Sequence, residues 1–191
     1  MVLWVPVAEA FLPSAFRCQF TQEEKSLVSG RINKSEGQIE YRKPGRIRFE
    51  IKKPNQLVFV GNPKRAWYYT APPFEGEPGE VIISKGAQHP ILKFFDILSS
   101  GFAENKSYKV NKNDGVVTLN FTKKAQEEFD LKSAVLNMGK DYTFPTLSKI
   151  SVTLTDGKTI QLVLSDLVPN VALPDSRFIF QIPDNTRQTR Q

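Results

Sequence analysis

Histidine and cysteine, which most often supply catalytic or metal-binding groups, each occur once in this chain, as His89 and Cys18. A catalytic histidine needs a nucleophile and an orienting partner, and the sequence offers no such arrangement around His89. Because His89 precedes Pro90 at the start of an apolar helical pattern, we expect it to have a structural or capping role. The chain has no Cys/His cluster, glycine-rich phosphate loop or nucleophile elbow. The sequence therefore predicts no enzyme, no bound metal and no cofactor.

A single cysteine excludes an intramolecular disulfide bond. Arg17 stands where a lipid-attachment motif needs a small residue, so we expect Cys18 to be a small apolar packing residue. The N-terminus carries an apolar run, Val2 to Val7, followed by Ala8-Glu9-Ala10, which fits a small-x-small cleavage pattern. Residues 1–10 are either the remnant of a signal peptide or an N-terminal extension, and both readings stay open.

The composition is that of one globular domain with a basic surface. The 191 residues carry a net charge of +6 and include 14 phenylalanines. The basic residues alternate along predicted strands and no nucleic-acid-binding motif is present, so we expect a solvated sheet face and no nucleic-acid partner. The many phenylalanines indicate either an ordinary aromatic core or a cavity lined with rings.

Apolar residues alternate with polar ones through most of the chain, which predicts strands with one buried face. Between Gly37 and Pro73 we expect three consecutive strands, and further strands fill the C-terminal half, with a hairpin at Asp156-Gly157. Phe178, Phe180 and Ile182 predict a last strand, and residues 184–191 a flexible tail. Residues 123–137 have good helix propensity, but we favour strand there.

One helix is predicted, from about His89 to Ser99, with an apolar stripe of Ile91, Leu92, Phe94, Phe95 and Leu98. Nine to eleven antiparallel strands expose more apolar surface than this helix can cover. We therefore expect a mainly β fold: an incomplete, half-open antiparallel barrel whose apolar cavity is closed by a short helical lid.

The order of motifs in this chain resembles the LolA family of periplasmic lipoprotein carriers. The motifs are Gly37-x-Ile39-x-Tyr41-Arg42-Lys43-Pro44, Lys53-Pro54-Asn55, Trp67-Tyr68-Tyr69-x-x-Pro72, the lead-in Phe16 with Phe20-Thr21-Gln22, and the closing segment Pro174 to Pro183. The similarity runs from about Phe11 to Pro183 and is weak over residues 100–145. Three departures from the family pattern are present. Lys43 replaces an arginine, Gly61-Asn62-Pro63-Lys64 replaces an aspartate-glycine turn, and the long N-terminal helix of the family is missing or interrupted by proline.

The resemblance implies a single LolA-like domain over residues 1–191 that binds the acyl chains of lipoproteins and shuttles them from the inner to the outer membrane. It implies a periplasmic monomer whose partners are acylated lipoproteins, an inner-membrane lipoprotein-releasing ABC transporter and an outer-membrane acceptor. The alternatives are a carrier of another lipid, such as a glycolipid or phospholipid, a lipoprotein-sensing regulator, and the acceptor branch of the family, which the missing lipid-attachment motif disfavours.

The expected site has a cavity, a lid and a latch. The cavity is expected to be lined by Phe20, Ile39, Tyr41, Ile47, Phe49, Phe59, Trp67, Tyr69, Phe178 and Phe180. The lid is the apolar stripe of the predicted helix. Lys43, in the place of the family's arginine, is the candidate latch between barrel and lid. Arg42, Arg46 and Arg48 are candidates to face an acidic partner, with an ordinary solvated face as the alternative.

Overall fold

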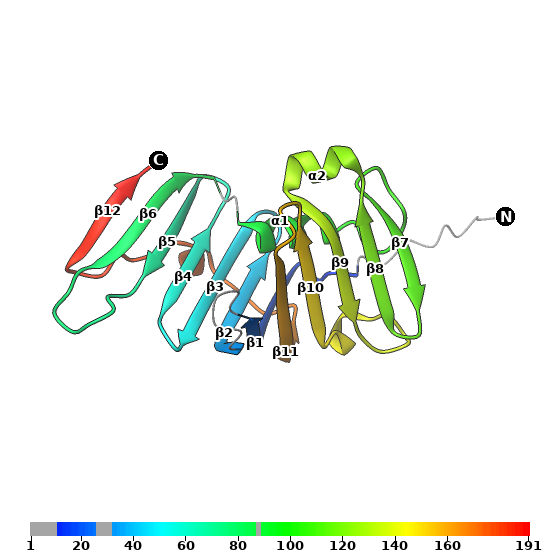
Figure 1. The fold of residues 1–191 in the computed structure, drawn as a ribbon, viewed down its shortest axis with the longest axis horizontal. Coiled ribbons are helices and arrows are strands. Elements are labelled where there is room, and N and C mark those ends of the chain that lie inside the picture. The colour runs from blue at the N-terminus through cyan, green and yellow to red at the C-terminus, as the bar shows by residue number, and fades with distance from the viewer. Residues whose placement is uncertain (1–10, 26–31, 87–88) are drawn as a thin grey trace.

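The computed structural model describes residues 11–25, 32–86 and 89–191, and across these ranges twelve strands form one sheet (Figure 1). Residues 1–10, on which the signal-peptide question turns, lie outside the described ranges. The strands are β1 (Ala15–Lys25), β2 (Ile32–Arg42), β3 (Arg46–Lys53), β4 (Leu57–Gly61), β5 (Arg65–Thr70), β6 (Gly79–Lys85), β7 (Tyr108–Asn113), β8 (Val116–Phe121), β9 (Leu131–Asn137), β10 (Lys149–Leu154), β11 (Thr159–Pro169) and β12 (Thr186–Arg190).

The sheet stays open. Its strand order is β12-β6-β5-β4-β3-β2-β1-β11-β10-β9-β8-β7, so β12 and β7 form the two edges (Figure 1). Every neighbouring pair is antiparallel except β12 and β6, which run parallel. The predicted fold class, a mainly β chain with an unclosed antiparallel sheet, is confirmed.

The turns explain where strands begin and end. The Asp156-Gly157 hairpin is confirmed between β10 and β11, with Gly157 at a φ of 88° that favours glycine. The region Gly37 to Pro73 holds four strands and not three, because Pro54 follows β3 and cannot donate to a ladder, so the chain breaks before β4. Strands β6 and β7 form where no strand was expected.

Two α-helices lie within the described ranges. α1 (Pro90–Leu98) matches the predicted helix, and His89 caps it, since its Nδ1 accepts the N–H of Ile91 at 3.2 Å. The preference for strand over residues 123–137 is wrong for α2 (Lys123–Phe129) and confirmed for β9 (Leu131–Asn137). Thr122 caps α2 and Asp130 ends it at a φ of 60°, and only then does β9 begin. Neither described helix has the length and apolar character needed to cross a bilayer.

The C-terminal segment also differs from the prediction. Residues 178–182 do not form a strand: a short 3-10 helix, Asp175–Phe178, is followed by irregular chain up to β12. Phe178 packs with Ala15 and Leu173, while Phe180 packs on Tyr69. The apolar residues of this segment thus cover the sheet and do not join its ladder. The polar tail, expected to be flexible, pairs through Thr186–Arg190 with β6 as the edge strand β12.

The main core lies on one face of the sheet, which we call the inner face. It is built from alternating residues of β1–β5 and β7–β11 together with the apolar side of α1. The opposite, outer face carries a second small cluster made of Val58, Val60, Trp67, Tyr69 and Val81. The two clusters are covered by different segments: α1 and α2 pack on the main core of the inner face, and the C-terminal segment packs on the outer cluster.

Candidate functional site

Helix α1 fills the middle of the inner face with aromatic and aliphatic side chains. All five predicted lid residues, Ile91, Leu92, Phe94, Phe95 and Leu98, are buried in the main core. The ring of Phe95 lies 5.1 Å from that of Phe16 and 5.4 Å from that of Tyr41, measured between centroids. These distances suit favourable aromatic contact. The space predicted as a cavity is therefore occupied by the side chains of α1 in this structure.

Asp96 makes the polar contacts between α1 and the β2–β3 turn. The Tyr41 hydroxyl donates to Asp96 Oδ1 at 2.7 Å, and the N–H of Gly45 donates to the same oxygen at 3.1 Å. Burial and the neighbouring Asp96 carboxylate raise the pKa of Tyr41, which stays a hydrogen-bond donor across the physiological range. Asp96 thus provides a specific link between α1 and the sheet.

Lys43, the predicted latch, lies in the turn after β2 and is half-buried. Its backbone N–H donates to the carbonyl of Ser14 at 3.0 Å. Within the described residues its ammonium group makes no ion pair or hydrogen bond with α1. Its role as a latch stays a prediction, and the tie that the structure provides runs through Tyr41 and Asp96.

His89 joins the start of α1 to the aromatic rows of β3 and β4. Its ring stacks on Phe59 with 4.5 Å between centroids and lies 5.5 Å from Phe49. Burial lowers the pKa of His89 to about 4, because the charged form would lose its hydration. Protonation would also convert Nδ1 from the acceptor of the cap into a donor, so α1 is best supported while His89 is neutral.

His89 should make the protein less stable in mild acid. Its pKa is about 6.5 in the unfolded chain and about 4 in the folded one. The unfolded chain therefore binds a proton at a higher pH than the folded chain does. As the pH is lowered from 6.5 to 4, the free energy of unfolding should fall, and below pH 4 His89 should have no further effect on it. We expect a loss of about 3 kcal/mol at most. Urea unfolding of wild type and His89→Asn, which keeps a capping side chain, measures it. The prediction is wrong if the variant shows the same slope.

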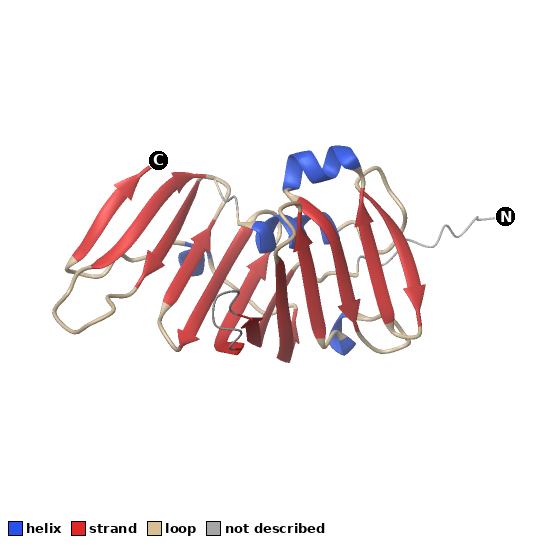
Figure 2. Cartoon of the chain, in the orientation of Figure 1, coloured by secondary structure: helices blue, strands red, loops and turns tan. Residues whose placement is uncertain are grey.

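Part of the inner face is not covered by a helix. Figure 2 shows α1 near the middle of the sheet and α2 at the ends of β8 and β9, while β5, β6 and β12 extend beyond both helices. On these strands Tyr68 and Ile82 are direct cross-strand neighbours on the same face as Phe59, and both are exposed, at 38% and 40%. An apolar strip therefore continues from beneath the start of α1 to the open part of the sheet.

The structure separates the predicted cavity residues into two faces. Phe20, Ile39, Tyr41, Ile47, Phe49 and Phe59 lie together on the inner face. The other four do not: Trp67, Tyr69 and Phe180 belong to the outer cluster, and Phe178 lies in a third cluster beside Ala15. Register explains the correction, because Trp67 pairs with Val60 while Phe59 pairs with Tyr68, so Trp67 points away from Phe59.

The three arginines predicted to face a partner are engaged within the chain. Arg42 pairs with Asp175 and donates to the carbonyl of Leu173 at 2.6 Å, while Arg46 lies 3.5 Å from the same Asp175 carboxylate. Arg48 lies 3.4 Å from Glu50. The Arg42 guanidinium beside Asp175 lowers the pKa of that carboxyl group. Arg42 and Arg46 therefore hold the C-terminal segment on the outer face, and a role of the three arginines toward a partner stays a prediction.

A bidentate ion pair was missed by reading the sequence. Glu40 is 3% exposed, and both of its carboxylate oxygens accept hydrogen bonds from Arg177 at 2.9 Å. The two residues are 137 positions apart, so no local pattern connects them. The same holds for Asp96: it is the one acidic residue of α1, but sequence alone does not name its partner.

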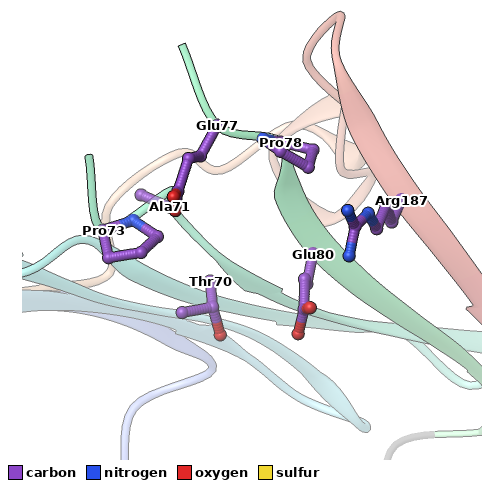
Figure 3. A pocket seen from close by; sticks show the side chains of 7 residues that line it. All are labelled: Thr70, Ala71, Pro73, Glu77, Pro78, Glu80 and Arg187. Atoms are coloured by element: carbon purple, nitrogen blue, oxygen red, sulfur yellow. The ribbon is translucent and has the colours of Figure 1, made fainter. Parts of the chain in front are cut away.

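A surface pocket of about 450 Å³ lies between the β5–β6 loop and β12 (Figure 3). It is lined by Thr70, Ala71, Pro73, Glu77, Pro78, Glu80 and Arg187. Figure 3 shows Glu80 and Arg187 on neighbouring strands, with Glu77 above them on the loop. Charges of both signs line this space, so it does not suit an apolar ligand.

Comparison with known proteins places the chain in a family. Residues 13–181 match the family described as outer membrane lipoprotein carrier protein LolA. The chain belongs to the LolA family. Its identity to individual members is low, as expected for a divergent member.

Relatives within the LolA family carry the same description. An outer-membrane lipoprotein carrier protein of Chromobacterium violaceum is 26% identical over 158 residues, which are 81% of this chain and 71% of the relative. One of Idiomarina loihiensis is 21% identical over 168 residues, 86% of this chain and 76% of the relative. A solved LolA superfamily structure from Nitrosomonas europaea is 11% identical, covers 90% of this chain and 93% of its own, and has a TM-score of 0.47.

Gly37, the first residue of the motif that resembles the LolA family, has a physical reason to be glycine. A Cβ atom there would lie 2.2 Å from the carbonyl oxygen of Glu50 and 2.5 Å from the ring of Phe20. The ring of Phe20 therefore lies against the backbone of β2 and stacks on Phe49 at 4.7 Å. The motif glycine makes room for the aromatic row that lines the inner face.

Proposed function

We propose that this chain is a periplasmic carrier that binds the acyl chains of lipoproteins on its inner face and shuttles the lipoproteins from the inner to the outer membrane. The proposal takes an inner-membrane lipoprotein-releasing ABC transporter as the donor, an outer-membrane acceptor as the receiver, and a monomer as the working form. The observation that carries it is the packing of one nine-residue helix, α1, into the aromatic inner face. Family membership supports the same reading.

Acyl chains would bind by taking the place of α1. Six apolar side chains of α1 are buried, and exposing them to water would cost about 9–18 kcal/mol, at roughly 1.5–3 kcal/mol each. An acyl chain gains about 0.8 kcal/mol per buried methylene, so about 11–22 buried methylenes offset that cost. Without cargo, α1 stays packed on the inner face. With cargo, the acyl chains replace the apolar side chains of α1 on that face. Such an exchange keeps binding reversible, as delivery requires.

The exposed strip at Tyr68 and Ile82 gives acyl chains a place of first contact. It adjoins Phe59, whose ring stacks on His89 at the start of α1. A chain that lies on this strip would meet the beginning of the lid helix. We therefore propose that cargo enters from the side of β5 and β6 and displaces α1 from its N-terminal end.

A synthetic triacylated lipopeptide tests the proposal. Native mass spectrometry should show a one-to-one complex, and the same peptide without acyl chains should not bind. Tyr41→Phe removes a hydrogen bond of about 1 kcal/mol that exists only while α1 is closed, so the apparent affinity should rise about fivefold. Tyr69→Phe, on the outer face, serves as the control and should leave the affinity unchanged.

Two results would contradict the carrier role. The first is no complex with the lipopeptide in either wild type or Tyr41→Phe. The second is a complex only with free phospholipid or glycolipid, which would favour a carrier of a different lipid.

A further inference from the structure

A second pocket, of about 500 Å³, lies where β5 begins and where β6 and β12 end. It is lined by Lys64, Arg65, Ile83, Ser84, Lys85, Arg190 and Gln191. Four of these side chains are cationic, and no carboxylate side chain is among the described residues that line the space. The pocket of Figure 3, at the opposite end of β6, instead combines Glu77 and Glu80 with Arg187. The two ends of this strand therefore differ in the charge they present.

The four cations are brought together by strand register. Arg65 and Lys85 are direct cross-strand partners in the β5–β6 ladder, an arrangement that is destabilising for like charges. Arg190 is paired with Ile83 on the next strand, and Lys64 precedes Arg65 in the turn. All four are exposed, and none forms an ion pair in the part of the chain that the structure describes. A bound anion would relieve this repulsion.

The backbone around the pocket is fixed by hydrogen bonds. Asn62 Oδ1 accepts the N–H groups of Lys64 and Arg65, both at 3.0 Å, and its amide nitrogen donates to the carbonyl of Phe178 at 2.9 Å. The N–H of Gly86 donates to the carbonyl of Lys64 at 3.2 Å, which ties β6 to this turn. The backbone that carries Lys64, Arg65 and Lys85 is therefore preorganised, which lowers the entropy lost on binding a ligand.

The side chain of Arg65 lies beside the ring of Trp67. Its guanidinium carbon lies 5.8 Å from the centroid of the Trp67 ring. A guanidinium that lies over an aromatic ring can still donate its N–H groups to an oxyanion. Planar arginine donors and the point charges of lysines are the groups that proteins use for phosphate.

We infer that the pocket formed by Lys64, Arg65, Lys85 and Arg190 binds a phosphate group. The ligand is either free phosphate or the phosphate of a lipid headgroup, since both present the same charged oxygens. This inference does not depend on the carrier function, because the pocket lies apart from the residues that pack against α1.

Titration with inorganic phosphate at low, constant ionic strength tests the inference, with backbone amide shifts of residues 64, 65, 85 and 190 as the readout. Wild type should show saturable shifts. The double variant K64Q/R65Q should bind at least tenfold more weakly. The matched control K123Q/K124Q removes two exposed charges from α2 and should bind like wild type. Equal weakening in both variants, or no saturable shift in wild type, would overturn the site, since long-range charge alone would then explain the response.

Flotation with phosphatidylglycerol vesicles distinguishes the two sources of phosphate. Binding that is lost in K64Q/R65Q and kept in K123Q/K124Q assigns the pocket to a lipid headgroup. Saturable phosphate binding without vesicle binding assigns it to a small free anion. Vesicle binding that both variants retain, together with no phosphate shift, contradicts the inference.

Discussion

Phe95→Ala should lower the free energy of unfolding by about 3–5 kcal/mol and at the same time tighten the binding of a triacylated lipopeptide at least tenfold. Phe95 is 1% exposed and its ring contacts those of Phe16, Tyr41 and Phe94. Truncation removes contacts that exist only when α1 is closed. The closed state therefore loses stability, and the competition between α1 and the acyl chains weakens.

The matched control is Phe121→Ala. Phe121 is also buried, at 4%, but its ring contact is with Tyr108 of the neighbouring strand. We expect this variant to lose stability without gaining affinity. Denaturant unfolding and lipopeptide titration measure both quantities. If the two variants change affinity equally, or if Phe95→Ala weakens binding, then α1 does not compete with the cargo.

Arg177→Met should destabilise the fold by about 2–3 kcal/mol. Glu40 is buried on the outer face, and removing its bidentate partner leaves a carboxylate without compensation. This loss is smaller than the usual cost of about 3–5 kcal/mol for breaking a buried ion pair, because the Arg177 side chain is 45% exposed. Urea unfolding with an unchanged m-value measures the loss.

A double-mutant cycle isolates the pair. Glu40→Gln alone should cost less than about 1 kcal/mol, and Arg177→Met/Glu40→Gln should recover more than half of the loss, because no buried charge then remains. Additive losses in the double variant would mean that Arg177 acts through packing of the C-terminal segment and not through Glu40.

Local patterns predicted much of this fold because they follow directly from burial. Alternation identified most strands, and the stripe at Ile91, Phe94 and Phe95 identified α1 with its capping histidine. The ends of strands were harder to predict from the sequence. Pro54 separates β3 from β4 within a pattern that is typical of one continuous strand. The polar sequence of β12 has no alternation to detect, since it pairs through its backbone at an exposed edge.

The candidate site was predicted in part. Alternation grouped six of the ten residues expected to line a cavity, and these six do share one face of the sheet. It could not tell that Trp67 faces away from Phe59, because that depends on the register across the β4–β5 turn. Asp96 and Arg177 acquire their roles from residues 55 and 137 positions away, and a single sequence holds no record of such pairs. The resemblance to the LolA family indicated the class of function, and the structure showed which face of the sheet each aromatic residue lies on.

A photoreactive acyl chain on the lipopeptide tests the central claim most directly. After crosslinking, mass spectrometry identifies the labelled residues. We predict labels on the inner face, at Phe20, Phe49 and Phe59 and along the strip at Tyr68 and Ile82. Labels confined to the outer cluster around Trp67, Tyr69 and Phe180, or no specific label, would contradict the account.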